Sequence, residues 1–411
     1  MPLLRLIVSP NKFSLMLGAS MFLFLGDAIL SYLFPIIVEE TVVSFSLVGL
    51  ILAASSLVGL IFDLIFPFVF PNIDWKLSNL LGVLFGLTFP VFVFLGQDFN
   101  QPIFYLIASI VWGIYFEFLG FSRQDGVVEL DTEKNFTQTW GIIYALLAFC
   151  GFIGPIIASL AFGADQVVAR TIVFALYFAS VILSFALFRS KDTTIQKKES
   201  KLIHTISFVR EIRYWAILEV KTFPIFLTLI YLAAVSSFFW TFGGLYGEEL
   251  FGESGFGWLL LAVYTLPELI FSLAFTKFVI KRRKKFLSFI LIILSGATLV
   301  PLIFIEEKLM LLPIIFAFSS LNAVTWILVR SVFSDLESRA KEFKVHVEAI
   351  FQSTESIGFI IGPLLTGLII DGVGFKNSLV ILGTLSIFIG FFLLIITPEK
   401  LKIPIKRLRQ I

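Results

Sequence analysis

Twelve long apolar runs, each of about 20 residues or more, dominate this sequence. A helix that crosses the hydrocarbon core of a bilayer needs about 20 mainly apolar residues. Strands of a membrane barrel are about half as long and alternate between apolar and polar side chains, which these runs do not. We therefore expect twelve membrane-spanning helices. Their predicted ranges are 13–38, 46–70, 77–96, 102–122, 136–162, 170–188, 222–246, 256–278, 285–305, 309–330, 346–370 and 377–397.

The amino-acid composition supports a membrane protein and excludes several other classes. The 411 residues are 58% hydrophobic and only 15% charged, which is too little charge to cover the surface of a soluble protein. A net charge of +2 gives no basic field for nucleic acid. One cysteine, Cys150, and two histidines, His204 and His346, provide neither a disulfide nor a metal site. The first run, 13–38, exceeds the apolar core of a signal peptide, so we expect it to be a span.

The positions of the basic residues predict the orientation. If the N-terminus is cytoplasmic, 28 of the 31 lysines and arginines lie in cytoplasmic segments, and the outer loops hold only Arg170, Lys308 and Lys376. Basic residues are retained on the cytoplasmic side of membrane proteins. We therefore expect a multi-pass protein of the plasma membrane with both termini in the cytoplasm.

A basic hydrophilic stretch, 189–221, divides the spans into six and six. It separates a predicted N-terminal bundle, 1–188, from a predicted C-terminal bundle, 222–411. Shifting the second half back by 207 to 209 residues superposes similar elements. The matched pairs are Ile61–Leu64 with Ile270–Leu273, Glu39-Glu40 with Glu248-Glu249, Arg123 with Arg330, and Gly154-Pro155 with Gly362-Pro363. We expect an all-α integral membrane protein with twelve transmembrane helices in two six-helix bundles related by pseudo-two-fold symmetry.

With this repeat, the chain resembles the major facilitator superfamily of secondary transporters over nearly its whole length. Gly154-Pro155-Ile156-Ile157-Ala158-Ser159 is similar to a helix-packing element in span 5 that the family associates with antiporters, and Gly362-Pro363 begins its counterpart in span 11. Glycine permits close helix contact, and proline kinks a helix. The family's charged motif between spans 2 and 3 is absent, since 68–76 reads FVFPNIDWK.

Five acidic residues fall inside predicted spans, whereas every lysine and arginine is expected in a loop or at a span end. The acids are Asp27, Asp63, Glu117, Glu268 and Glu355. In the resembled fold, spans 1 and 4 line the central cavity, and spans 2, 8 and 11 help to bound it. An acid within a bilayer is costly and is usually functional. We expect these acids to form a coupling and substrate cavity that exchanges H⁺, with Na⁺ as the competing ion. Alternatively, some are protonated hydrogen-bond donors between helices.

Two further groups of residues are candidate gates. Arg123, Arg330 and Glu348 are expected at the cytoplasmic ends of spans 4, 10 and 11, where the resemblance implies salt bridges between the halves. The alternative for the arginines is ordinary interfacial anchoring. Tyr32 and Trp240 superpose at an offset of 208 in the outer parts of spans 1 and 7. They are candidates for an aromatic gate or a substrate contact, although packing against lipid is the more common role of such residues.

The sequence predicts a secondary active transporter, not an enzyme, that moves a small organic solute by alternating access. No Gly-x-x-x-x-Gly-Lys-Ser/Thr loop for nucleotide is present, and we expect no cofactor. Proton-coupled efflux is the first expectation, and a sodium- or proton-coupled sugar or solute symporter is the alternative. A lipid flippase, or a membrane enzyme acting on a lipid-linked substrate, is the alternative of another class. We expect a monomer whose partners are the solute and membrane lipid.

Overall fold

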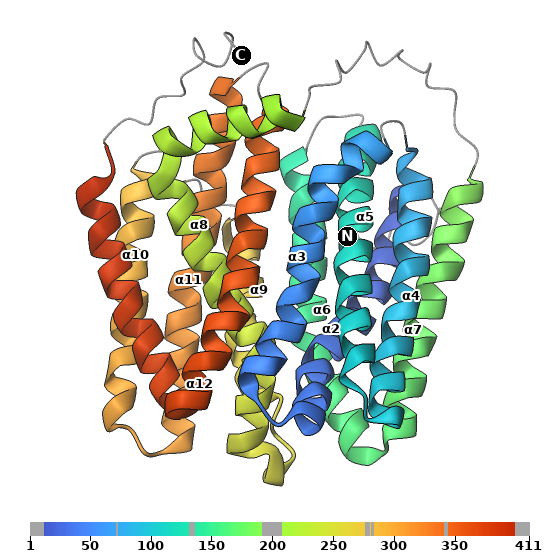
Figure 1. Cartoon of the computed structure of the whole chain (residues 1–411), viewed down its shortest axis with the longest axis horizontal. Helices are drawn as coiled ribbons and strands as arrows, with labels where there is room; N and C mark the ends of the chain where they lie inside the picture. The colour runs from blue at the N-terminus through green and yellow to red at the C-terminus, as the bar shows by residue number, and fades with distance from the viewer. Residues whose placement is uncertain are drawn as a thin grey trace.

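A computed structural model of the chain describes residues 12–70, 73–130, 136–190, 208–275, 280, 283–340 and 344–398. Within these ranges every regular element is helical, as expected (Figure 1). The N-terminal part comprises α2 (Lys12–Val42), α3 (Phe45–Val69), α4 (Trp75–Phe99), α5 (Pro102–Leu130), α6 (Phe136–Ala164) and α7 (Gln166–Arg189). The C-terminal part comprises α8 (Phe208–Phe251), α9 (Leu259–Phe275), α10 (Lys284–Leu299), α11 (Lys308–Ala340) and α12 (Lys344–Ile396), with the short 3₁₀ helices η1 (Gly252–Ser254) and η2 (Val300–Phe304).

These helices account for all twelve predicted spans. Ten of them are long and apolar enough to cross a membrane, and α9 is a shorter apolar helix. The remaining span is the second part of α12, because Gly374 interrupts that helix with a φ of 79° and a ψ of 170°. A positive φ is readily adopted only by glycine, so the chain reverses direction there. Within the predicted linker, 208–221 is helical as the first part of α8, whose candidate membrane span begins at Thr222, and 191–207 lies outside the described residues.

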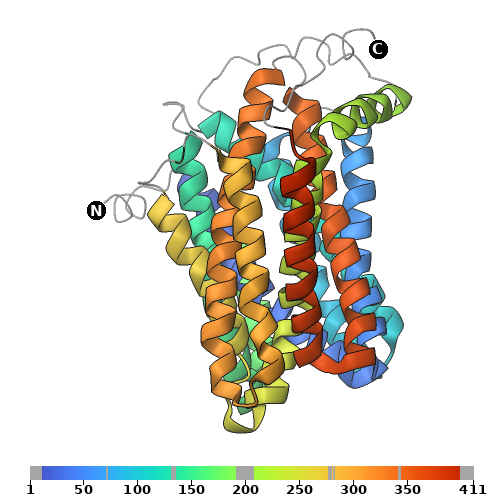
Figure 2. The same ribbon diagram turned by 90° about the vertical axis from the view of Figure 1, so that its left-hand side faces the viewer.

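The helices form two groups that lie side by side with their axes roughly parallel (Figures 1 and 2). Helices α2–α7 make up the N-terminal half, and α8–α12 make up the C-terminal half. The halves contact each other through α3 with α12, α6 with α9 and α2 with α8. We call the end that holds the α2–α3, α6–α7 and α8–α9 connections and Gly374 the outer end, in line with the predicted orientation.

The two Gly-Pro elements lie at equivalent helix contacts, one in each half. A Cβ on Gly154 of α6 would come within 2.5 Å of the Cβ of Ala28 on α2. A Cβ on Gly362 of α12 would come within 2.7 Å of the Ala234 carbonyl oxygen on α8. Only glycine allows backbones to approach this closely.

A second equivalence between the halves is a pair of buried lysines. The Lys76 Nζ donates to the Ser190 carbonyl oxygen at 3.2 Å, at the end of α7. The Lys285 Nζ donates in the same way to the Pro398 carbonyl oxygen, just after α12. Each lysine donates to a backbone carbonyl just beyond the end of a helix, after α7 in one half and after α12 in the other. These residues were not among the matched pairs of the internal repeat. Lys76 and Lys285 are 209 residues apart, and Ser190 and Pro398 are 208 apart, in agreement with the repeat.

Candidate functional site: a buried acid network between the two halves

Asp27 on α2 lies inside the N-terminal half. Its side chain is 7% exposed, and its Oδ1 accepts a hydrogen bond from the Tyr115 hydroxyl on α5. The Trp112 side chain, also on α5, interacts with the same carboxyl group. Sequence reasoning placed Asp27 at the cavity but missed Tyr115, since one tyrosine in an apolar helix carries no distinguishing signal.

Asp63 on α3 and Glu117 on α5 are hydrogen-bonded to each other through their side chains. The contact is close because α3 presents Gly59 to the acid: a Cβ on Gly59 would lie 2.8 Å from the Glu117 Oε1. An ionised carboxylate can only accept hydrogen bonds. A hydrogen bond between two carboxyl groups therefore forms only when one of them carries a proton, which the two groups then share.

Arg123 lies among these acids, which corrects the expectation that no base lies inside the membrane beside them. Its side chain is 9% exposed, its Nε donates to the Leu119 carbonyl oxygen at 3.1 Å, and its guanidinium lies 4.8 Å from the centre of the Phe24 ring. It interacts electrostatically with Glu117 and Asp27. The physical reason is that α5 continues to Leu130 instead of ending near residue 122, so Arg123 is inside the helix rather than at its end.

In the C-terminal half, Arg330 also lies beside an acid instead of at the end of its helix. Arg330 on α11 forms an ion pair with Glu355 on α12, with 3.3 Å between Nη2 and Oε2. Its Nη1 donates to the Tyr144 hydroxyl on α6 at 3.0 Å, which is a contact between the halves. Helix α11 runs to Ala340, beyond the predicted end at 330, and this brings Arg330 alongside Glu355. The side chain of Glu348 lies outside the described residues, so its predicted place in a cytoplasmic gate stays a prediction.

Glu268 on α9 differs from the other four acids. No hydrogen bond or ion pair involves its carboxylate within the described part of the chain, although it interacts electrostatically with Arg330 and Glu355. Its side chain is exposed, whereas its neighbours on the same helix face, Tyr264 and Leu261, are 7% and 0% exposed.

The side of α9 on which Glu268 lies follows from helix geometry. At about 100° per residue, Glu268 lies within about 40° of both Tyr264 and Leu261, and about 140° or more from the exposed Ile270 and Leu273. Ile270 and Leu273 mark the lipid-facing side, because apolar side chains face the acyl chains. Glu268 is therefore accessible on the inner face of α9.

The separate contacts join into one electrostatic network across the interface. Glu117 of the N-terminal half interacts electrostatically with Glu355 of the C-terminal half, and the Tyr144 hydroxyl of the N-terminal half accepts a hydrogen bond from Arg330 of the C-terminal half. Five acids and two arginines make the network acidic even with one proton on the Asp63–Glu117 pair. Tyr144 is the central residue of the crossing, and sequence reasoning missed it because a tyrosine near a span end is usually an interfacial anchor.

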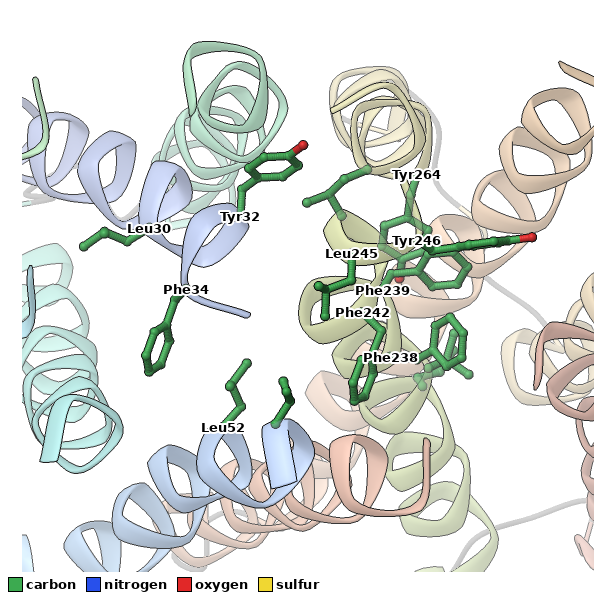
Figure 3. Close-up of a cluster of buried hydrophobic side chains, with 14 of the residues drawn as sticks. Leu30, Tyr32, Phe34, Leu52, Phe238, Phe239, Phe242, Leu245, Tyr246 and Tyr264 are labelled. Atoms are coloured by element: carbon green, nitrogen blue, oxygen red, sulfur yellow. The ribbon is translucent and has the colours of Figure 1, made fainter. Parts of the chain in front are cut away.

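At the outer end, aromatic side chains from both halves meet (Figure 3). The Tyr32 hydroxyl on α2 donates to the Glu248 carboxylate on α8, and Tyr32 is 1% exposed. Trp240 on α8 lies against α6, where a Cβ on Gly151 would come within 3.2 Å of its ring. Tyr32 thus lies between the halves. It does not pack against lipid, which is the more common role of such a residue.

No protein-family model matches this sequence, and no curated protein matches it in sequence. Among solved structures, the chain is similar to the nucleoside transporter NupG. A mutant of NupG matches with a TM-score of 0.74 and 12% identity over 93% of this chain and 100% of that one. Another structure of NupG matches with a TM-score of 0.73 and 12% identity over 94% and 98%. The predicted fold class, an all-α membrane protein of major-facilitator type, is confirmed. Both matched structures are of a nucleoside transporter.

Proposed function

We propose that this protein is a secondary active transporter of the major facilitator superfamily, which moves a small organic solute by alternating access with H⁺ as the coupling ion. The shared fold with NupG supports the transporter assignment. The Asp63–Glu117 hydrogen bond is the observation that carries the choice of ion. We also propose that it acts as a monomer in the plasma membrane with both termini in the cytoplasm.

The coupling step follows from the chemistry of the carboxyl pair. With one proton, Asp63 and Glu117 hold α3 and α5 together at Gly59. Loss of that proton leaves two adjacent carboxylates that repel each other, and the Glu117 charge then interacts more strongly with Arg123 and with Glu355 across the interface. Proton release thereby changes the electrostatic interaction between the halves, which must move relative to each other in alternating access.

The same network indicates the class of solute. Arg330 is occupied by Glu355 and Tyr144, and Arg123 is in contact with an aromatic ring, so neither arginine is presented as a clamp for an anion. Glu268 offers a free carboxylate on an inner helix face. We therefore propose a neutral or cationic solute that donates hydrogen bonds to Glu268. Nucleosides are the first compounds to test, because NupG is a nucleoside transporter.

We propose export as the physiological direction, on the basis of the antiporter-like Gly154-Pro155 element. Uptake of a sugar or nucleoside by symport is the alternative. A pH gradient of each sign across the same vesicles distinguishes the two modes, because an antiporter moves solute opposite to the proton flow and a symporter moves it in the same direction.

The test uses purified protein in proteoliposomes with an imposed pH gradient, an imposed Na⁺ gradient or neither. The proposal expects the pH gradient alone to accelerate transport of radiolabelled solute, and expects Glu117→Gln to remove that acceleration. Solute flux that responds only to Na⁺, or a Glu117→Gln variant that keeps the wild-type response to pH, would contradict proton coupling at this pair.

A further inference from the structure

The acid Asp371 makes an unusual contact at the outer end of the bundle. It precedes the Gly374 reversal in α12, yet it binds the first turn of α3 in the other half. Its Oδ1 accepts from the Phe45 backbone N–H at 3.0 Å, and its Oδ2 accepts from the Ser46 backbone N–H at 3.0 Å. The Ser44 hydroxyl donates to Oδ2 at 3.2 Å, and the Ser46 hydroxyl also donates to it. One carboxylate therefore accepts all four hydrogen bonds.

Hydrogen bonds of this kind satisfy the N–H groups that a helix leaves unpaired in its first turn. A carboxylate there also interacts favourably with the positive end of the helix dipole. The usual source is a residue immediately before the helix. This is what the chain does at α7, where the Asp165 Oδ1 accepts from the Val167 N–H at 2.9 Å, and at α4, where Asp74 accepts from the Lys76 N–H at 3.0 Å.

The contrast with Asp165 is informative because both acids lie at outer connections. Asp165 lies in the connection between spans 5 and 6, and Asp371 lies before the corresponding connection between spans 11 and 12. Asp165 caps the helix that follows it, whereas Asp371 caps a helix more than 320 residues away, as the separation of 326 residues from Phe45 shows. Asp371 therefore joins the two halves, whereas Asp165 stabilises only a helix of its own half.

Close backbone contact surrounds the Asp371 cap. A Cβ on Gly49 of α3 would overlap the Pro363 carbonyl oxygen of α12, and a Cβ on Gly367 of α12 would overlap the Phe45 carbonyl oxygen of α3. Helices α3 and α12 are therefore in backbone contact at their outer ends. Any movement that opens the outer end between them must break the four hydrogen bonds of Asp371.

We propose that Asp371, bound to Ser44, Phe45 and Ser46, forms an outer latch that holds the transporter closed to the outside. Asp371 is a positioning residue: it touches no solute and acts by stabilising one of the two alternating states. This inference rests on the alternating-access part of the proposed function, but not on the identity of the solute or of the coupling ion. It adds a residue that sets how often the outer side opens.

The test measures the outer opening directly, without transport. In a chain in which the buried Cys150 is replaced by alanine, a reporter cysteine is placed at Leu52, which is 5% exposed and faces the contact between the halves (Figure 3). The rate of its modification by a membrane-impermeant maleimide, added outside, reports the open population. Loss of a helix cap costs about 1 kcal/mol, so Asp371→Ala is expected to raise the rate about fivefold. Asp371→Asn, which retains an acceptor, should raise it less.

Three variants keep the test decisive. Asp165→Ala removes a cap of the same kind within one half and should leave the rate unchanged. Gly49→Ala adds a methyl group at the α3–α12 contact and should also raise the rate, while Gly372→Ala, whose Cβ meets no atom within 4 Å, should not. Modification of Asp371→Ala at the wild-type rate, or an equal rise in Asp165→Ala, would overturn the latch. If the wild-type protein moves no solute but the labelling rates of the variants are as expected, the result counts against the proposed function and not against the latch.

Discussion

In the N-terminal half, Asp27 accepts a hydrogen bond from Tyr115, and Asp63 shares a hydrogen bond with Glu117. In the C-terminal half, Glu355 is paired with Arg330, and Glu268 has an accessible carboxylate on an inner helix face. The first half therefore pairs its acids with groups that share or donate protons, and Arg123 interacts with Asp27 and Glu117 electrostatically while its Nε donates to a backbone carbonyl. The second half pairs one acid directly with an arginine and leaves the other accessible.

This difference assigns separate tasks to the two halves. A carboxyl pair changes its charge when a proton leaves, so the N-terminal half is suited to hold the coupling proton. A carboxylate paired with an arginine is stabilised by a fixed positive charge instead of a shared proton. The C-terminal half is therefore suited to bind a solute and to respond to the charge of the N-terminal half. The predictions below test this division, beginning with the largest expected effect.

The strongest effect is expected from Glu117→Gln and Asp63→Asn. Each substitution removes the carboxyl pair and with it the shared proton, so solute flux driven by a pH gradient should fall about 100-fold or more, the size of effect found for single proton-transfer groups. Exchange of labelled for unlabelled solute, which needs no net proton movement, should continue. Exchange that is lost together with driven flux would show a general defect and contradict a specific role in coupling.

Glu268→Gln should have the next largest effect, on solute binding rather than on coupling. A hydrogen bond to a charged group contributes about 1.5–3 kcal/mol, which corresponds to a loss of affinity of about 10- to 150-fold. Thermal stabilisation of the purified protein by graded solute concentrations measures that affinity. The matched control is Glu253→Gln, an exposed acid in η1 at the outer end, which should leave affinity unchanged. Wild-type affinity in Glu268→Gln would remove Glu268 from the solute site.

A smaller effect is expected from Tyr144→Phe. This variant loses the hydrogen bond to Arg330 that links the halves, and a single such bond contributes about 1–1.5 kcal/mol, or roughly a five- to tenfold shift between states. Spin labels on α6 and α11 would report the shift as a change in their distance distribution. Tyr105→Phe is the control, since its hydroxyl binds Thr41 at 3.0 Å within the N-terminal half. An unchanged distribution in Tyr144→Phe would show that this bond does not couple the halves.

The smallest effect is expected from Asp27→Asn. An asparagine oxygen can accept the Tyr115 hydrogen bond in place of the carboxylate, so the buried contact is kept. Flux driven by a pH gradient should change by less than about threefold, as for a neutral hydrogen-bond exchange. A loss as large as that of Glu117→Gln would place the coupling proton on Asp27 instead.

The fold could be predicted from the sequence because membrane spans are specified by length and hydropathy alone. The twelve runs, the repeat and the five acids could all be found from the residues. The partners of the acids could not, since they depend on where helices end and how they pack. Arg123 and Arg330 were expected at span ends, and only the continuation of α5 and α11 places them beside Glu117 and Glu355.

Contacts between distant residues were the other unpredictable part. Asp371 lies in a predicted connection, and no local pattern distinguishes it. Only the packing of α3 against α12 brings it to the first turn of α3. Lys76 and Lys285 had been counted only as basic residues on the cytoplasmic side, although both bind carbonyl groups at helix ends. In each case the informative property is a tertiary contact that no local pattern encodes.

The proton shared by Asp63 and Glu117 is the central claim, and infrared spectroscopy of the protein in membranes at neutral pH tests it most directly. The wild-type spectrum minus that of the Asp63→Asn/Glu117→Gln double variant should contain the carbonyl stretching band of a protonated carboxyl group, shifted in D₂O. The same subtraction with Glu355→Gln should contain no such band, because Glu355 is paired with Arg330. A double-variant difference spectrum without the protonated carboxyl band would show that the pair holds no proton and would contradict proton coupling at this site.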